Sequence, residues 1–343
     1  MVLGALTLAA CTAPPSEGAY ELTYASPYSP GHPFSKADIA WMKEVEAKSG
    51  GRLKIRPSWA GALLSSNQSL IEIRHGVADL GLVTPIYTRG GAHLMRAQSG
   101  FYGGVKSMQD QVAVYRCLEA EFPQLSKEME GLVLLAVQGG NFPGIVTRDK
   151  PVRTLADLKG LRLRVPAELN PVMRKLGADP VDMPMGEVYS AMAKGVIDGV
   201  VAPADTFRSL HFGEIAKYYS AIHISRGGYP ARAMSKGVFD ALPSDLQKVL
   251  LDARPMWENA ILTEIAKAEV TGAAFGKESG VQWVAFDAAD QKRFDQIYNE
   301  SALEDARRLK RLGIDGEPVF RKAQALISGG VVNCGTPMRE TAS

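Results

Sequence analysis

Residues 161–165 alternate apolar and polar side chains, the period-two pattern of a strand with one buried face. Just before them, Thr154 and Asp157 stand at capping-box spacing, which predicts a short helical turn leading into the strand. Pro166 follows and lacks the N–H needed to continue a strand ladder. Arg164 is therefore expected on the polar face, at the carboxyl end of a strand. Open α/β sheets bind ligands at that edge, and a guanidinium there can hold a carboxylate through two parallel hydrogen bonds. A plain surface arginine is the alternative.

Strand patterns of this kind alternate with helical patterns along most of the chain. They follow one another up to about residue 137 and start again after Gly144. This order predicts a mostly parallel sheet flanked by helices in each half of the chain. The expected strands are residues 20–26, 52–57, 79–83, 132–137, 145–147, 161–165, 197–201, 221–225 and 281–286.

A short internal repeat favours two halves of similar build. Residues 76–85 and 195–203 both read as a glycine that ends a helix, a turn aspartate, an apolar strand, and a proline at the strand's carboxyl end. So short a match can arise by chance, because helix-to-strand turns share part of this pattern. Its occurrence once in each half favours two α/β lobes whose strand ends face each other, with a ligand bound between them.

The later segments predict a hinge. Gly227 and Gly228 permit a bend, after which residues 231–234 should return to the first lobe, so the chain crosses between the lobes more than once. Residues 243–280 form a helical stretch that is too long for one lobe. We expect Pro255 to kink this helix at a cost of about 3 kcal/mol, which packing must offset.

Composition and charge exclude several classes of protein. The chain has 343 residues, 46% of them hydrophobic, which is enough apolar material for two domains. With 39 basic and 37 acidic residues, the net charge of +2 gives no reason to expect nucleic acid as a partner. The sequence contains no run of about 18 apolar residues, so we expect no membrane-spanning helix.

Signals of catalysis or of a cofactor are missing from the sequence. It contains none of the common nucleophile, zinc-protease, phosphate-loop or dinucleotide motifs. The five histidines lack the spacing of metal ligands, so each is expected to cap a helix or support the fold. We therefore expect no enzyme activity, no cofactor and no metal site.

The first residues have the character of a targeting segment. Residues 1–11 are apolar and end in small residues before Cys11, which resembles a bacterial lipobox in which the cysteine is lipidated. An ordinary cleaved signal with a chance cysteine is the alternative. The expected basic region is missing, which suggests a start upstream of Met1, and residues 12–18 resemble a tether. The sequence leaves open whether the two other cysteines, Cys117 and Cys334, form a disulfide with each other.

Several longer stretches resemble one family. They are DLKGLRLRVP, LGADPVDMPMGEVYSAMAKGVIDGV, GHPFSKADIAWMKEVEAKSGGRLKI, IEIRHGVADLGLV and LPSDLQKVLLDA. All are similar to the solute-binding subunits of tripartite ATP-independent periplasmic (TRAP) transporters, the DctP family. By the family's usual extent, the resemblance runs from about Tyr20 to about Val331.

The resemblance implies a two-lobed α/β periplasmic solute-binding fold, with a ligand cleft between the lobes and a long helix spanning both. Residues 1–19 would be the leader and tether, residues 20–142 plus about 229–270 the first lobe, residues 143–228 plus about 271–331 the second lobe, and residues 332–343 a tail. It also implies that Arg164 clamps the carboxylate of an organic acid, which the protein delivers to membrane permease subunits. We expect a monomer outside the cytoplasm, anchored by lipid at Cys11.

Three positions depart from the family pattern. A second ligand arginine of many relatives falls on Pro143 here, a ligand-bonding asparagine falls on Ala202, and a pocket aromatic falls on Met185. Donors for a second carboxylate or a polyhydroxy tail are thus lost, and methionine adapts to irregular apolar shapes. With Arg164 retained for one acid group, we expect a monocarboxylate with an apolar or aromatic body rather than a C4-dicarboxylate or sialic acid.

Other residues are expected around that apolar body. Phe142 and Phe207 are predicted to face it, with Tyr28 and Thr84 reaching in from the first lobe. Asp205 would suit a ligand amine, although a solvated or helix-capping role is the simpler interpretation. Two other functions stay open: a ligand-sensing subunit for a signalling protein, and a two-lobed periplasmic hydrolase or lyase.

Overall fold

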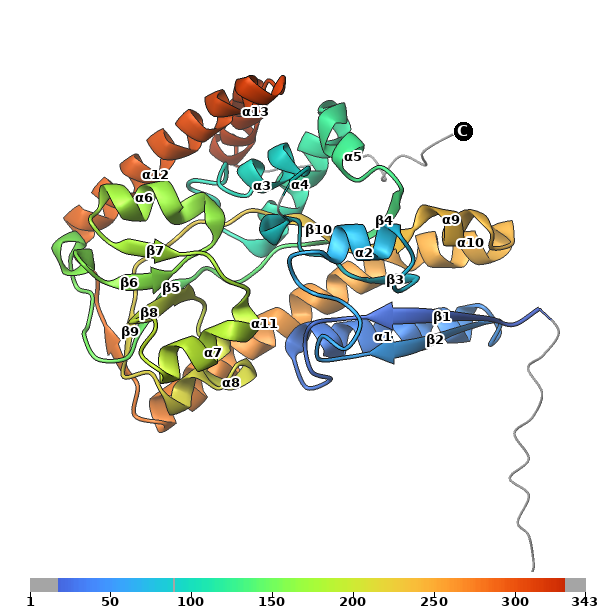
Figure 1. The fold of residues 1–343 in the computed structure, drawn as a ribbon, viewed down its shortest axis with the longest axis horizontal. Coiled ribbons are helices and arrows are strands. Elements are labelled where there is room, and N and C mark those ends of the chain that lie inside the picture. Colours follow the sequence, from blue (N-terminus) through green and yellow to red (C-terminus); the bar gives the residue numbers. More distant parts are fainter. Residues whose placement is uncertain (1–17, 89, 331–343) are drawn as a thin grey trace, which may run out of the picture.

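The computed structural model describes residues 18–88 and 90–330 and contains two mixed sheets, each at the centre of one lobe (Figure 1). The first sheet has the strand order β2-β1-β3-β10-β4. Its strands are β1 (Tyr20–Ala25), β2 (Leu53–Ser58), β3 (Leu80–Leu82), β4 (Leu132–Gln138) and β10 (Tyr229–Ser235). The second sheet has the order β11-β9-β5-β8-β6-β7. Its strands are β5 (Gly144–Thr147), β6 (Arg162–Arg164), β7 (Asp179–Val181), β8 (Gly199–Ala202), β9 (Tyr218–Ser220) and β11 (Gln282–Val284).

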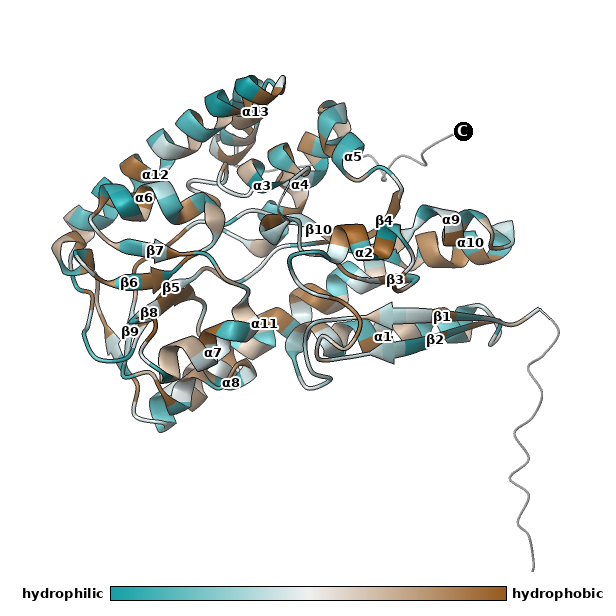
Figure 2. Cartoon of the chain, in the orientation of Figure 1, coloured by the Kyte–Doolittle hydropathy of each residue, from teal (hydrophilic) through white to brown (hydrophobic). Residues whose placement is uncertain are grey.

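The sheets are mixed rather than mostly parallel, and the chain's path explains why. β10 runs antiparallel to β3 and β4, and β5 runs antiparallel to β8 and β9. Each of these strands arrives from the opposite lobe. It therefore enters its sheet at the edge where the parallel strands end, and must run in the reverse direction. Figure 2 shows β5 and β8 as hydrophobic ribbons, as expected for strands buried on both faces.

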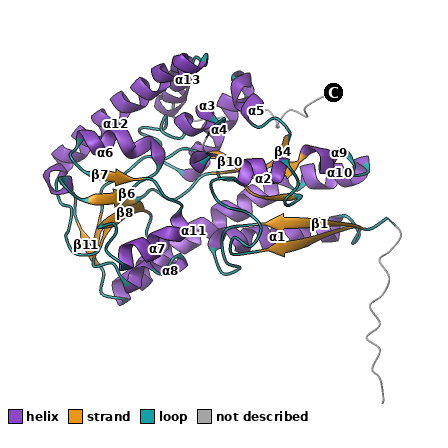
Figure 3. Cartoon of the chain, in the orientation of Figure 1, coloured by secondary structure: helices purple, strands orange, loops and turns teal. Residues whose placement is uncertain are grey.

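Helices cover both faces of the sheets (Figure 3). They are α1 (Pro33–Lys48), α2 (Ser69–Arg74), α3 (His93–Gln98), α4 (Met108–Glu121), α5 (Pro123–Glu128), α6 (Asn170–Lys175), α7 (Met185–Ala193), α8 (Thr206–Ser209), α9 (Lys236–Asp240), α10 (Ser244–Asp252), α11 (Arg254–Glu278), α12 (Ala288–Arg308) and α13 (Glu317–Ser328). Local signals explain some of the boundaries. The capping box of Thr154 and Asp157 forms as predicted and starts the short turn η2 (Leu155–Leu158), which leads to β6.

The long helix predicted after residue 243 is two helices. α10 ends at Asp252, and α11 begins at Arg254 with Pro255 in its first turn. The missing N–H of a proline costs no helical hydrogen bond there, so the expected kink penalty does not arise. The 25-residue α11 packs against α1 and β4 in the first lobe and against α8 in the second. The predicted helix spanning both lobes is therefore confirmed, and Figure 1 shows it running from one lobe to the other.

Two extended segments also connect the lobes. The outgoing segment, residues 139–143, links β4 to β5, and the return segment, residues 221–228, links β9 to β10. A strand over residues 221–225 was predicted wrongly, because the chain leaves the second sheet after Ser220 to cross to the first. The glycines that end the return segment allow close packing. A Cβ on Gly227 would lie 2.5 Å from the Tyr102 ring, and one on Gly228 would lie 2.4 Å from the Gln111 carbonyl oxygen.

The division of the chain between the lobes stays a prediction. α12 begins against the second lobe, where Phe294 and Tyr298 join a core around β6. Its later residues, Ala302 and Ala306, join a core of the first lobe together with Phe320 of α13. The C-terminal helices thus touch both lobes.

The leader with Cys11, the tether, the tail and Cys334 lie outside the described residues. The lipid anchor is therefore still a prediction, and the two alternatives for the buried Cys117, paired with Cys334 or not, stand as the sequence left them. No helix in the described ranges is long and apolar enough to cross a membrane.

Candidate ligand-binding cleft

A cavity lies between the two lobes, where the strand ends face each other. We call it the inner cavity. Its wall is largely apolar or aromatic and includes Tyr28, Phe34, Ile86, Tyr87, Met185, Leu210, Tyr229 and Ile265. Polar groups are few and include Thr84, Asn141, Asp205 and Arg226. A mostly apolar wall with a small number of polar groups is the usual build of a small-molecule site.

The predicted site residues divide into three groups. Tyr28, Thr84, Met185 and Asp205 line the inner cavity. Arg164 stands behind the wall, bonded to the lining residue Tyr87.

Three predicted residues, Phe142, Ala202 and Phe207, do not belong to the lining. Phe142 packs its ring 4.6 Å from that of His223. Ala202 is fully buried at the end of β8. Phe207 is fully buried against Tyr219 and Trp283, because α8 turns its ring into the core.

Arg164 connects the lobes. Its Nε donates to the carbonyl oxygen of Met183 at 2.9 Å, just before α7. Its Nη2 donates to the hydroxyl of Tyr87 at 2.6 Å, in the turn η1 (Pro85–Tyr87) of the first lobe. The side chain is 3% exposed, and no carboxylate in the described residues forms an ion pair with it. A buried cation without an anionic partner is costly, which is consistent with a site prepared for an anion.

Arg226, in the return segment, is a lining residue that sequence reasoning missed. Its guanidinium lies over Gly140 of the outgoing segment, so that a Cβ on Gly140 would be 2.6 Å from Cζ. One sequence signal was present: the arginine immediately precedes the two glycines that were predicted to mark the crossing between the lobes.

Buried carboxyl groups surround the inner cavity. Burial raises the pKa of Asp205 to about 6, against the opposing effect of hydrogen bonds from Asn141 and Ser209. Burial, and then the charge of Asp205, raises the pKa of Glu269 to about 7. Burial also raises the pKa of Glu168, whose Oε2 has no hydrogen-bond partner in the described chain. These carboxyl groups therefore offset the positive charges of Arg164 and Arg226 less than ordinary ionised carboxylates would.

His32 supports the wall rather than binding a metal. Its Nδ1 accepts a hydrogen bond from the backbone N–H of Phe34 at 3.2 Å and so caps α1, and its ring stacks on Tyr28 with centroids 4.0 Å apart. Burial, and then the charge of Arg232, lowers its pKa to about 3, so the ring is neutral. This confirms the predicted capping role for His32. Among the described residues, no cluster of three potential ligands suits a metal ion.

A buried network holds the first-lobe wall to the long helix. Arg232 is 0% exposed, and its Nε lies 2.7 Å from Oδ1 of Asp38, which also accepts a hydrogen bond from Nε1 of Trp257 at 2.9 Å. Arg232 also donates to Gln138, whose amide donates to the Tyr229 hydroxyl at 3.0 Å. The position of Tyr229 in the cavity wall is therefore tied to α11 through Trp257.

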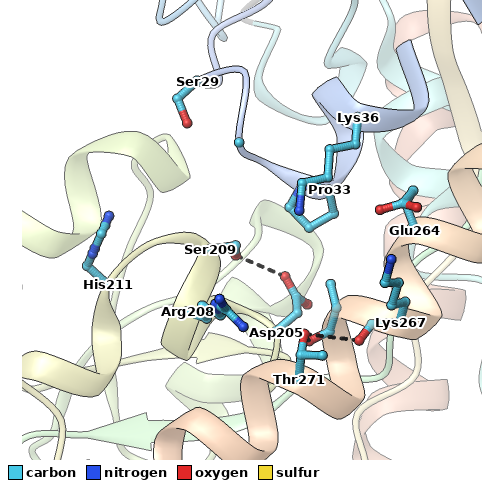
Figure 4. A pocket seen from close by; sticks show the side chains of 12 residues that line it. Ser29, Pro33, Lys36, Asp205, Arg208, Ser209, His211, Glu264, Lys267 and Thr271 are labelled. Atoms are coloured by element: carbon cyan, nitrogen blue, oxygen red, sulfur yellow. Dashed lines mark hydrogen bonds between the residues drawn. The ribbon is translucent and has the colours of Figure 1, made fainter. Parts of the chain in front are cut away.

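A second, larger cavity of about 370 Å³ lies beyond Asp205, which lines both. Figure 4 shows this outer cavity with Lys36 of α1 on one side, Asp205 and Arg208 on another, and Lys267 on α11. Its lining is mainly charged and polar, with residues such as Lys36, Arg208 and Lys267, as is usual for the surface of a protein. The inner cavity is the better candidate site, because its wall is aromatic, Arg226 lines it, and Arg164 lies behind the lining residue Tyr87.

A comparison with protein-family models matches residues 24–307 to the bacterial extracellular solute-binding proteins of family 7, DctP. The chain belongs to this family. A solute-binding protein of Albidiferax ferrireducens is 27% identical over 272 residues, which cover 76% of this chain and 78% of that protein.

Solved structures of TRAP solute-binding proteins share the fold. One from Rhodoferax ferrireducens, in complex with copurified benzoate, has a TM-score of 0.82 at 23% identity and covers 91% of this chain and 98% of its own. One from an unidentified marine microbe, specific for aromatic acid ligands and in complex with metahydroxyphenylacetate, has a TM-score of 0.79 at 23% identity and covers 90% and 98%.

As a member of this family, the protein is an extracellular solute-binding protein. The family consists of solute-binding proteins rather than enzymes. The described structure fits such a receptor, because its cleft lies between two lobes that are joined by extended segments and a shared helix.

Proposed function

We propose that this receptor binds a monocarboxylate with an apolar or aromatic body, and that Arg164 holds the carboxylate. The observation that carries this proposal is the inner cavity itself, a mostly apolar and aromatic wall with Arg164 directly behind Tyr87. The benzoate and metahydroxyphenylacetate bound by the two solved relatives have the same chemistry, one carboxylate on a ring. Met185 adds a flexible apolar side chain to the wall.

Arg164 can exchange its hydrogen bond to Tyr87 for one to a ligand carboxylate. Its Nη2 donates a hydrogen bond to the hydroxyl of Tyr87, a group that carries no negative charge in accepting it. A carboxylate makes charge-assisted hydrogen bonds with a guanidinium that are roughly twice as strong as neutral ones. A ligand carboxylate that enters beside Tyr87 therefore gains the stronger bond, while Met183 continues to hold Nε in place.

The remaining predictions about the receptor's surroundings belong to the same proposal. We infer that the protein acts as a monomer, is attached to the membrane through lipid on Cys11, and passes its ligand to the permease subunits of the transporter. Extraction of the full-length protein with detergent tests the anchor. A Cys11→Ser variant is expected in the soluble fraction, whereas an anchored variant would contradict this part of the proposal.

A ligand screen with two arginine variants tests the carboxylate site. Benzoate, phenylacetate and mandelate are expected to raise the melting temperature of the wild-type protein, and succinate, malate and sialic acid to leave it unchanged. Arg164→Gln should lose about 10- to 100-fold in affinity, since a hydrogen bond to a charged group is worth about 1.5–3 kcal/mol.

Arg162→Gln is the matched control, because Arg162 lies on the same strand but is exposed and pairs with Asp179 at the surface. It should bind aromatic acids as the wild type does. Stabilisation by succinate or malate and by no aromatic acid would contradict the proposed ligand class, and unchanged affinity in Arg164→Gln would contradict the role of Arg164.

A further inference from the structure

We propose that Arg226 is a second carboxylate-binding residue of the cleft and that it contacts the same acid group as Arg164. This inference rests on the proposed function, because it assumes a carboxylate ligand in the inner cavity. It assigns to the return segment the task that the family resemblance places at Pro143, where this chain has no arginine.

The first support is the exposure of the Arg226 guanidinium to the cavity. Arg226 lines the inner cavity directly, and its side chain makes no hydrogen bond or ion pair with any residue in the described ranges. Other polar lining groups are already engaged: the amide of Asn141 donates to the carbonyl of Ile265 at 3.0 Å, and Asp205 accepts from Ser209 at 3.2 Å. Arg226 thus has its donors available to a ligand.

The second support is the close packing of the Arg226 guanidinium on Gly140, which we call its seat. Gly140 has no side chain, and a Cβ there would lie 2.6 Å from both Cζ and Nη1 of Arg226. The backbone of Gly140 is fixed on both sides by the buried Gln111, which accepts from its N–H at 2.7 Å and donates to its carbonyl oxygen at 3.1 Å. The glycine is therefore needed for the arginine to lie flat against the outgoing segment.

The same glutamine fixes the segment that carries Arg226. A Cβ on Gly228 would lie only 2.4 Å from the backbone carbonyl oxygen of Gln111. The carbonyl oxygen of Gly228 also accepts a hydrogen bond from the side chain of Gln98 at 3.0 Å. Gln111 consequently contacts both crossing segments, at Gly140 in the outgoing one and at Gly228 in the return one. The backbone that carries Arg226 is therefore held in place, so less conformational entropy is lost when this segment contacts an anion.

The third support is the field that the two arginines share. The charges of Arg164 and Arg226 both act on the Tyr28 hydroxyl and on the carboxyl group of Glu168. Tyr28 lines the cavity, so a carboxylate near its hydroxyl lies within the field of both guanidinium groups. Two cations in a cleft with few counter-charges attract an anion more strongly than one alone.

The test measures binding of benzoate and of its neutral analogue benzamide by calorimetry. Arg226→Gln is expected to weaken benzoate binding about 10- to 100-fold and to leave benzamide binding within about threefold of the wild type. Arg226→Lys, which keeps the charge but not the fork of donors, should fall between the wild type and Arg226→Gln. Arg174→Gln, at an exposed position of α6, is the control and should bind both compounds as the wild type does.

A second pair of variants tests the seat without changing any charge. Gly140→Ala is expected to push the guanidinium away and to weaken benzoate binding by a smaller factor than Arg226→Gln. Gly237→Ala, in α9, is the matched control, because a Cβ there meets no atom within 4 Å. It should not affect binding.

The outcomes separate this inference from the proposed function. Wild-type affinity for benzoate in Arg226→Gln, combined with a loss in Arg164→Gln, would overturn the inference alone. Equal losses of benzoate and benzamide binding in Arg226→Gln would also overturn it, because they indicate a merely structural role. A wild-type protein that binds no benzoate would overturn both.

Discussion

Asp205 and Glu269 meet where the second lobe touches the long helix. Glu269, on α11, accepts hydrogen bonds from the backbone N–H groups of Ala204 at 3.3 Å and Asp205 at 3.0 Å, just before α8. Burial raises the cost of ionising Glu269, and the charge of Asp205 adds to that cost. Asp205 was predicted to meet a ligand amine, to be solvated, or to cap a helix. It begins α8 without a side-chain cap bond and lines both cavities.

The raised pKa of Glu269, about 7, predicts a pH dependence of stability. Below about pH 4.5 the group is protonated in both the folded and unfolded states and costs nothing. As the pH rises from about 4.5 to about 7, the group ionises in the unfolded state before it does so in the folded state, so the free energy of unfolding decreases; above about pH 7 it is ionised in both states and the decrease ends. In Glu269→Gln this decrease should be smaller by about 1–2 kcal/mol between pH 5 and pH 8.

Urea unfolding at both pH values measures the effect. Glu278→Gln, at the exposed end of the same helix, is the control and should keep the wild-type slope. An unchanged slope in Glu269→Gln would show that Glu269 is an ordinary ionised carboxylate in the folded protein.

How far the site could be predicted is also visible at single residues. Three residues that were expected at the cleft do line it: Met185, Tyr28 and Thr84. Each lies at the end of a helix or strand, or just beyond it, and the sequence pattern places these ends where the two lobes face each other. Phe207 was expected there too, but the direction of its ring depends on the packing of α8 against Trp283, which no local pattern reveals. Arg226 was missed for a related reason: its seat is Gly140, 86 positions away in the chain.

At the scale of elements, α11 is the part on which both lobes depend. In the first lobe, Trp257 stacks on Trp41 of α1 with ring centroids 3.7 Å apart. In the second lobe, Gly272 lies so close to α8 that a Cβ would be 2.5 Å from the carbonyl oxygen of Ala204. The helix is thus held in the first lobe by the stacking of two tryptophan rings, and in the second lobe by the close approach of its Gly272 to the backbone before α8.

Gly272→Ala should therefore destabilise the protein, although alanine is the better helix former. The added methyl group meets backbone atoms, which cannot move aside as a flexible side chain can, and overpacking of this kind costs about 1–3 kcal/mol. Gly237→Ala, with open space around its Cβ, should stabilise the protein by up to about 1 kcal/mol. Urea unfolding compares the two variants. A stabilising Gly272→Ala would contradict the close contact between α11 and the second lobe.

The whole molecule is built so that a ligand can draw the lobes together. Two extended segments and one long helix join them, and Arg164 of the second lobe already reaches Tyr87 of the first. A ligand that contacts both lobes stabilises the closed arrangement by its differential affinity for that state.

Benzoate is therefore expected to reduce the radius of gyration of the wild-type protein, as measured by small-angle X-ray scattering at saturating ligand. Arg164→Gln should show no such compaction at the same concentration, and Arg162→Gln should compact as the wild type does. Equal compaction in Arg164→Gln would show that closure does not depend on this arginine.

The sequence by itself determined the local elements and the position of Arg164. The alternation in residues 161–165, the capping box before it and the proline after it each act within a few residues, so they specify a strand that ends with an arginine at the cleft edge. The repeat of strand ends in residues 76–85 and 195–203 likewise indicated two facing lobes. Tertiary structure alone decided the reversed direction of β5 and β10, the bond between Arg164 and Tyr87, and the place of Arg226 over Gly140. These features join residues far apart in the chain, and they arise only when both crossing segments and α11 bring the two lobes into contact.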